Sequence, residues 1–235
     1  MKVLMVHAHP EPHSFCAALK NQAVATLTAQ GHEVCVSDLY AMQFNPVATA
    51  GDFLQRENPE YLNYALEQRS AFAAGKLCAE IQTEINKVID AELLIFSFPI
   101  YWMSMPAIMK GWIDRVFVSG LFYGGKRIYA KGGMQGKQAL VCATLGGRDY
   151  MFGDKGIHGS LHGPTGMLRS LLQGSLGYVG MEVFEPFIGY HVPYITAEAR
   201  VQLLSDWQQA LLELDKRPVM QMPLLSDYDD TFRAR

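Results

Sequence analysis

The chain has no long apolar run, no closely spaced cysteine pair and no cluster of basic residues, and each absence excludes a class of protein. No hydrophobic stretch approaches the roughly 20 residues that a helix needs to cross a bilayer, so we expect no membrane span. The four cysteines are far apart, which predicts reduced thiols rather than disulfides. Net charge is only −3 over 235 residues, so nucleic acid is not an expected partner.

The N-terminal segment MKVLMVHAHP contains an apolar run that is too short for a signal peptide and that predicts a strand. Because no targeting segment is visible, we expect a cytoplasmic protein. The hydrophobic fraction of 49% is enough to build one large domain with a continuous core. We expect this domain to span residues 1–216 and residues 217–235 to form an extended tail.

Apolar strands alternate with helical segments along the whole chain. The pattern predicts strands at 2–6, 33–38, 93–98, 138–144 and 182–187, and helices at 14–30, 64–89, 107–116, 166–176 and 197–214. Gly75 is a weak point in the second of these helices. Residues 40–61 show no period and are expected to form a long loop, and residues 120–137 to form a turn or small hairpin.

This alternation predicts a parallel sheet with helices on both faces, joined by right-handed crossovers. The Rossmann arrangement expects G-x-G-x-x-G after the first strand, whereas the turn here, AHPEPHSF, has no glycine. The sequence therefore favours an α/β fold with a flavodoxin-like, doubly wound, five-stranded parallel sheet. In that arrangement a flavin binds where the strand order switches, between the first and third strands.

The segment SFPIYWMSMP follows the apolar third strand and cannot be regular structure. Pro99 and Pro106 each fix their own φ and push the preceding residue out of helical space. Between them lie Ile100, Tyr101, Trp102, Met103 and Met105, an unusual amount of apolar surface for a loop. Because loops at the carboxyl ends of parallel strands bind ligands, we expect a planar cofactor to lie on this loop.

The loop between the first strand and the first helix has the donors that a phosphate needs. Ser14, Phe15 and Cys16 would offer N–H groups at the helix N-terminus, Ser14 a hydroxyl and His9 an imidazole. A simpler reading makes Ser14 only the helix cap. We favour a phosphate site for the loop as a whole.

The same loop contains a possible metal-ligand pattern, His7-x-His9-x-x-x-His13. No aspartate stands beside the third histidine and no second cluster follows downstream. His7 would also be buried if alternate residues of the strand face the core. We therefore predict no metal site.

A second glycine-rich loop, TLGGRDYMFGDKGIH, follows the fourth strand. Gly146 and Gly147 allow the backbone to approach a ring closely. His158 could hold a proton or positive charge near a reduced ring, although a lone histidine is more often structural.

In order and spacing these segments resemble the flavin-dependent NAD(P)H:quinone oxidoreductases of the DT-diaphorase type. The resemblance rests on AHPEPHSF, DLYAMQFNP, FPIYWMSMPAIMKGWIDRVF, GGRDYMFGDKGIHG and EPFIGYHVPYITAEAR, and it covers the chain to about residue 214. The third of these motifs is highly specific.

The resemblance implies FAD as cofactor, with FMN less favoured, and a homodimer with active sites at the interface. It implies the following FAD-binding residues: His9, Ser14, Phe15, Cys16, Asn63, Pro99, Ile100, Tyr101, Trp102, Met103, Thr144, Leu145, Gly146, Gly147, Phe152 and Arg200. Asn63 and Arg200 would hold the adenine part. Trp102 and Met151 would contact substrate, and Tyr123 would cover the substrate pocket of the partner subunit.

One departure from the family concerns the charge on the reduced flavin. Family members commonly pair a tyrosine with the histidine, and that tyrosine position is Phe152 here, whose ring cannot donate a hydrogen bond. We take His158 as the catalytic residue and Tyr150 as a candidate substitute for the missing hydroxyl. The chain also lacks the longer C-terminal region of mammalian-type members.

The expected activity is two-electron transfer of a hydride from NAD(P)H via FAD to a quinone-like acceptor, in a ping-pong cycle. The protein would supply position and charge, and the flavin the chemistry. Two alternatives remain open, a flavin-binding regulatory subunit of an ion-transport system and a reductase of azo or nitro compounds.

Overall fold

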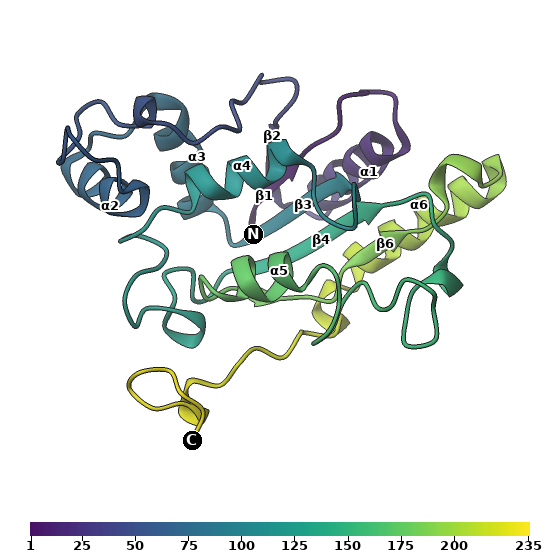
Figure 1. Cartoon of the computed structure of the whole chain (residues 1–235). Coiled ribbons are helices and arrows are strands. Elements are labelled where there is room, and N and C mark those ends of the chain that lie inside the picture. The colour runs from purple at the N-terminus through teal and green to yellow at the C-terminus, as the bar shows by residue number, and fades with distance from the viewer.

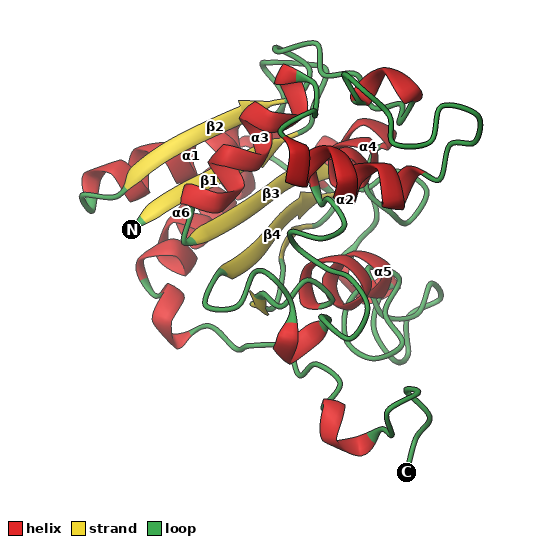
Figure 2. Ribbon diagram, turned by 90° about the vertical axis from the view of Figure 1, so that its left-hand side faces the viewer, coloured by secondary structure: helices red, strands yellow, loops and turns green.

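Alternate residues of the central strands point to opposite faces of the sheet, and both faces are apolar. In β1 (Lys2–His7), Leu4 and Val6 belong to a core of 34 buried residues, whereas Val3 and Met5 belong to a second core of 13. The sheet therefore needs cover on both sides. The computed structural model, which describes residues 1–235, shows that helices provide it (Figures 1 and 2).

All strand pairs in the sheet are parallel, in the order β2-β1-β3-β4-β5. The other bounds are β2 (Glu33–Asp38), β3 (Leu93–Pro99), β4 (Gln138–Thr144) and β5 (Glu182–Val183). This is the flavodoxin strand order, so the predicted fold is confirmed. The single strand expected at 182–187 is instead two pieces, because β6 (Phe187–Gly189) pairs separately with β4.

Two helices cover one face of the sheet and the remaining core helices cover the other. The small core joins the sheet to α1 (Phe15–Ala29) and α6 (Ala197–Leu212). The large core joins it to α3 (Ala79–Asp90), α4 (Ala107–Val116) and α5 (Arg169–Leu171), as Figure 1 shows. The chain thus changes face after β2, which is what the doubly wound arrangement requires.

The helix expected over residues 64–89 is two helices. The first, α2 (Tyr64–Ala74), ends at Gly75, which has a left-handed backbone with φ 65°. Glycine takes this conformation without a steric cost and so stops a helix that an alanine would continue. The helix expected at 166–176 is also shorter, because the three residues of α5 run into a π-helical segment, Leu172–Gly177.

A buried ion pair fastens the long loop between β2 and α2 to the domain. Arg115 Nη2 lies 2.7 Å from Asp52 Oδ1, and both side chains are buried. Tyr64 donates its hydroxyl to Asp52, and Arg115 also donates to the carbonyl of Asn45. Removing one member would leave a buried charge without a partner, so the network fixes where this loop lies.

Gly111 lets the same loop pack directly against α4. A β-carbon at this position would lie 2.1 Å from the carbonyl oxygen of Pro46. The loop backbone therefore occupies the space that any other residue of the helix would need.

A buried histidine and a buried serine face each other on neighbouring strands. His7 of β1 is paired in register with Ser97 of β3, and His7 Nδ1 lies 3.0 Å from Ser97 Oγ. Only 1% of His7 is exposed. Burial lowers the pKa of His7 to about 4, because the charged imidazolium is poorly solvated there.

The tail beyond Arg217 continues the edge of the sheet before it leaves the domain. Val219 forms an antiparallel bridge with Phe184, and the Met220 N–H donates to the Val183 carbonyl at 2.8 Å. A 3-10 turn, Leu225–Asp227, interrupts the otherwise extended arm. Figure 1 shows the arm projecting to the C-terminus away from the sheet. None of the helices is long and apolar enough to cross a membrane.

We expect Gly111→Ala to destabilise the fold by about 1–3 kcal/mol, because the new methyl group must displace the Pro46 backbone. Urea unfolding measures this change. Gly174→Ala is the matched control, since its β-carbon would come no closer than 3.8 Å to its surroundings. Equal stability of the two variants would contradict the proposed packing of the loop on α4.

We expect His7 to make stability depend on pH. Above its unfolded pKa of 6.5 the imidazole is neutral in both states. Between 6.5 and about 4 only the unfolded state binds the proton, so stability is lost as pH falls, by about 3 kcal/mol in all. Urea unfolding at pH 7 and pH 4.5 should show a smaller loss for His7→Asn than for the wild type. The exposed His13, changed to Asn, should leave the wild-type loss unchanged.

Candidate functional site

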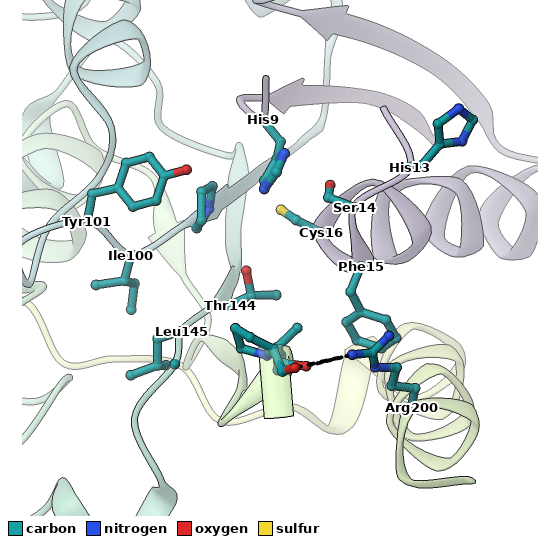
Figure 3. Close-up of a pocket in the computed structure, with 14 residues that line it drawn as sticks. His9, His13, Ser14, Phe15, Cys16, Ile100, Tyr101, Thr144, Leu145 and Arg200 are labelled. Carbon is teal, nitrogen blue, oxygen red and sulfur yellow. Dashed lines mark hydrogen bonds between the residues drawn. The ribbon is translucent and has the colours of Figure 1, made fainter. Parts of the chain in front are cut away.

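A pocket of about 460 Å³ opens at the carboxyl ends of β1, β3 and β4, the edge where open α/β sheets bind ligands (Figure 3). Its volume falls in the range of small-molecule sites. The lining residues come from the three strand ends, the start of α1, the loop after β6 and the start of α6: His9, His13, Ser14, Phe15, Cys16, Pro99, Ile100, Tyr101, Thr144, Leu145, Gly146, Val192, Pro193 and Arg200. Eleven of these fourteen residues are among the expected cofactor-binding residues.

The start of α1 presents free backbone donors to the pocket. Ser14 caps the helix, with its hydroxyl oxygen accepting from the Ala17 N–H at 3.1 Å. The Ser14 N–H donates to the Glu11 carbonyl, so it is not one of the free donors expected from the sequence. The N–H groups of Phe15 and Cys16 have no acceptor within the chain. Together with the positive end of the helix dipole, these two groups favour an anion.

His9 stands across the first loop with one ring nitrogen available. Its Nδ1 atom lies 3.0 Å from the Glu11 amide nitrogen and 3.1 Å from the Glu11 carbonyl oxygen. That nitrogen is engaged with the turn, which leaves Nε2 to face a ligand. In Figure 3, His9 and Tyr101 face each other from opposite walls of the pocket.

Cys16 connects the pocket to the buried polar pair below it. Its sulfur lies 3.7 Å from Ser97 Oγ, the hydroxyl that also contacts His7. Burial raises the pKa of the Cys16 thiol to about 11, so the side chain stays neutral. His7 is buried and His13 is exposed, and no group of three potential metal ligands occurs in the chain.

The loop after β3 ends in a tight, strained turn. Tyr101 and Ser104 exchange two backbone hydrogen bonds, of 2.9 and 3.0 Å, around Trp102 and Met103. Both central residues have positive φ, 50° and 60°, which defines a type I′ turn. Left-handed conformations cost non-glycine residues about 1–3 kcal/mol and often mark functional loops.

Trp102 is fully exposed at the tip of this turn and does not line the pocket. The sequence led us to expect its ring beside the cofactor. Within one chain the pocket wall is made instead by Pro99, Ile100 and Tyr101, whereas Trp102 and Met103 project beyond it.

The loop after β4 is fastened on both sides. The Ile100 N–H donates to the Thr144 carbonyl at 2.7 Å, which joins it to the β3 loop. The Leu145 N–H donates to the Gly189 carbonyl at 3.0 Å, and the Val192 N–H donates to the Leu145 carbonyl at 3.1 Å. The segment after β6 therefore braces the β4 loop and, through Val192 and Pro193, forms part of the pocket lining itself.

His158 lies beside the pocket rather than in its wall. Its ring packs against Phe152, with ring centroids 5.2 Å apart, and its backbone N–H donates to the Met151 carbonyl. The Phe152 ring in turn lies against Gly147, where a β-carbon would come within 2.7 Å of it. The half-buried Met151 accepts from the Arg148 N–H.

Tyr150, the candidate substitute for the hydroxyl missing at Phe152, is 70% exposed and makes no hydrogen bond to His158. The phenol ring nearest to Phe152 belongs to Tyr190, with centroids 5.9 Å apart.

Two expected residues lie far from the pocket of their own chain. Asn63 caps α2, at the end of the molecule opposite α6, where Arg200 is located (Figure 1). Tyr123 packs against Tyr178, with centroids 5.9 Å apart, in a separate surface hollow.

His13, Val192 and Pro193 line the pocket but were not among the expected cofactor-binding residues. The last two belong to the loop after β6. This loop leaves the sheet at the same edge as the loops after β1, β3 and β4. That shared edge is the signal by which the sequence could have identified Val192 and Pro193. Arg200 Nη2 lies 3.4 Å from the Val192 carbonyl oxygen and 3.5 Å from that of Pro193, which keeps the guanidinium beside the pocket (Figure 3).

Comparisons with known proteins agree with the fold. A family model described as flavodoxin-like fold matches residues 1–211. The chain is 37% identical over 235 residues to NAD(P)H dehydrogenase (quinone) 1 of Cavia porcellus, covering 99% of this chain and 84% of that protein. It is 41% identical over 211 residues to ribosyldihydronicotinamide dehydrogenase (quinone) of Homo sapiens, covering 89% and 90%.

A solved structure from Klebsiella pneumoniae, itself proposed to be a quinone reductase, superposes with a TM-score of 0.93. It is 35% identical and covers 100% of this chain and 94% of its own. The chain belongs to the NAD(P)H:quinone oxidoreductase family of flavodoxin-like proteins.

Proposed function

We propose that the protein is an FAD-dependent oxidoreductase that passes a hydride from NAD(P)H to a quinone in a ping-pong cycle. The observation that carries the proposal is the pocket itself. It joins two free N–H groups at the start of α1 to an apolar wall from the β3 loop and a glycine-containing wall from the β4 loop. One end thus fits a phosphate and the other a flat ring.

The pocket continues past the helix N-terminus, which favours FAD over FMN. Phe15, Val192, Pro193 and Arg200 line the side next to α6. FMN ends at its phosphate and would leave the Phe15 ring, Val192, Pro193 and Arg200 without a contact. FAD carries an adenosine beyond the phosphates, for which an aromatic ring and a guanidinium are suitable neighbours.

A flavin held in this pocket would supply the hydride-transfer chemistry between the nicotinamide and the acceptor. The chain's own groups bind and orient. Phe15 and Cys16 hold the phosphates through their N–H groups, and Ile100 and Leu145 exclude water from the two walls of the pocket. His158, next to Phe152, supplies a proton or positive charge near the ring, as a donor does in an oxyanion hole. The nicotinamide and the quinone bind one after the other at the open side of the pocket, near Trp102 and Met151.

We also propose that the working unit is a homodimer. Asn63 and Tyr123 do not line the pocket of their own chain, because Asn63 caps α2, at the end of the molecule opposite α6, and Tyr123 lines a different hollow. In a symmetric pair the same residues would reach the partner's pocket, Asn63 at the adenine end and Tyr123 over the substrate. The exposed aromatic tip at Trp102 would then be covered as well.

Protein produced with ample riboflavin is expected to be yellow and to carry one flavin per chain, released as FAD on mass analysis. It should sediment at twice the chain mass of 26.2 kDa. Anaerobic NADH or NADPH should bleach it, and menadione should restore the colour with many turnovers.

Other results of this experiment would support the alternatives. Protein that binds neither FAD nor FMN would overturn the proposal. Bound flavin with menadione turnover no faster than free flavin would favour a regulatory subunit. Faster turnover with azo dyes or nitroaromatics than with any quinone would favour the other reductase activities.

We expect His158→Ala to slow flavin reduction by NAD(P)H roughly 10²-fold, the usual effect of removing one preorganised donor. Stopped-flow absorbance measures it. His162→Ala is the matched control, because His162 lies in a different surface hollow and should leave the rate unchanged. Tyr150→Phe tests the exposed hydroxyl separately. An unchanged rate in His158→Ala would make the histidine structural.

A further inference from the structure

The loop after β4 has three successive carbonyl groups turned to the same side. The Leu145 carbonyl accepts from the Val192 N–H at 3.1 Å, and the Gly147 carbonyl accepts from the His191 N–H at 2.8 Å. The middle carbonyl, of Gly146, lies 2.9 Å from Nδ1 of the His191 ring. All three therefore face the brace formed by residues 191–192.

This arrangement dictates where the N–H groups of the loop point. In a trans peptide the carbonyl oxygen and the following N–H lie on opposite sides. With the Leu145 and Gly146 carbonyls held by the brace, the N–H groups of Gly146 and Gly147 point away from it. Neither has an acceptor within the chain, whereas the next N–H, of Arg148, contacts the Met151 sulfur at 3.4 Å. Two adjacent backbone donors are thus left free at the pocket wall, to which Gly146 belongs.

His191 holds this geometry from an uncommon backbone conformation. Its φ is 54°, in the left-handed region, which costs a non-glycine residue about 1–3 kcal/mol. In this conformation both its N–H and its ring reach the β4 loop, one to Gly147 and the other to Gly146. The ring is also supported by Tyr194, with centroids 4.9 Å apart.

The direction of the side-chain hydrogen bond is fixed by its acceptor. A carbonyl oxygen only accepts, so Nδ1 of His191 carries the hydrogen and donates it to Gly146. This is the one side-chain hydrogen bond on the Gly146–Gly147 peptide. Without it, only the backbone hydrogen bonds of the neighbouring Leu145 and Gly147 carbonyls would hold the loop to residues 191–192.

We propose that His191 is a positioning residue that fixes the Gly146–Gly147 peptide, so that its two neighbouring N–H groups stabilise the negative charge of the reduced flavin. The inference rests on the proposed function and names a residue that acts through the β4 loop. Donors held in place before the reaction favour the reduced, anionic ring over the oxidised, neutral one. His191 therefore helps to set the reduction potential of the bound flavin.

The test compares two substitutions at position 191. His191→Gly keeps the left-handed backbone at no steric cost but removes the donor. His191→Asn also tolerates that backbone, and its amide nitrogen, like Nδ1, is bonded to Cγ, so it can replace the donor. Tyr194→Leu is the control, because it removes the packing on the ring but leaves the hydrogen bond.

We expect His191→Gly to bind FAD but to lose about tenfold in preference for the reduced over the oxidised cofactor. For a two-electron couple this is a potential about 30 mV lower. His191→Asn and Tyr194→Leu should stay near the wild-type value. Equilibration with reference dyes of known potential measures all four proteins. Should the glycine variant fail to fold, His191→Ala replaces it with the same expectation.

A wild-type potential in His191→Gly would overturn the inference, as would an equal drop in His191→Asn. A drop in Tyr194→Leu as large as that in His191→Gly would assign the effect to ring packing and overturn it too. Failure of the wild-type protein to bind flavin would instead overturn the proposed function.

Discussion

The pairing of β3 with β4 is the constraint on which the site depends. Pro99 lies opposite Thr144 at the ends of the two strands, and the Ile100 N–H donates to the Thr144 carbonyl. The two loops therefore leave the sheet at the same level. A register shift of one residue would turn the side chains of one strand to the other face, and the two walls of the pocket would no longer meet.

The walls are kept rigid by hydrogen bonds within and between the loops. The β4 loop is braced by residues 189–192, and the β3 loop ends in a type I′ turn whose strain the surrounding structure maintains. Further back, Arg115 and Asp52 anchor the long loop that packs on α4. Binding loops on a rigid scaffold lose little freedom when a ligand binds, which favours affinity.

The polar groups of the site are arranged by depth. His7 and Ser97 are buried beneath the pocket, Cys16 lies at its floor, and the free N–H groups of Phe15 and Cys16 are at its surface. Burial keeps the histidine and the thiol neutral, so that the helix N-terminus is the positive feature an anion meets first.

The sequence alone determined the flavodoxin-like fold, because apolar strands that alternate with amphipathic segments allow few arrangements, and a first turn without glycine excludes the Rossmann type. Eleven of the fourteen residues that line the pocket are among those that the family resemblance names as cofactor-binding, a role that stays a prediction. The break at Gly75 was visible only as a weak point, since a glycine inside a helical pattern does not reveal its φ. Three features were decided only by the tertiary structure. The Ser14 N–H donates to Glu11 within the turn, Trp102 points into solvent, and the His191 ring donates to the Gly146 carbonyl. The first two depend on the local turns at residues 11–14 and 101–104, whose backbone dihedral angles the residue types do not fix. The third depends on a hydrogen bond between residues 45 positions apart, and local sequence patterns carry no information about which distant partner a group will find.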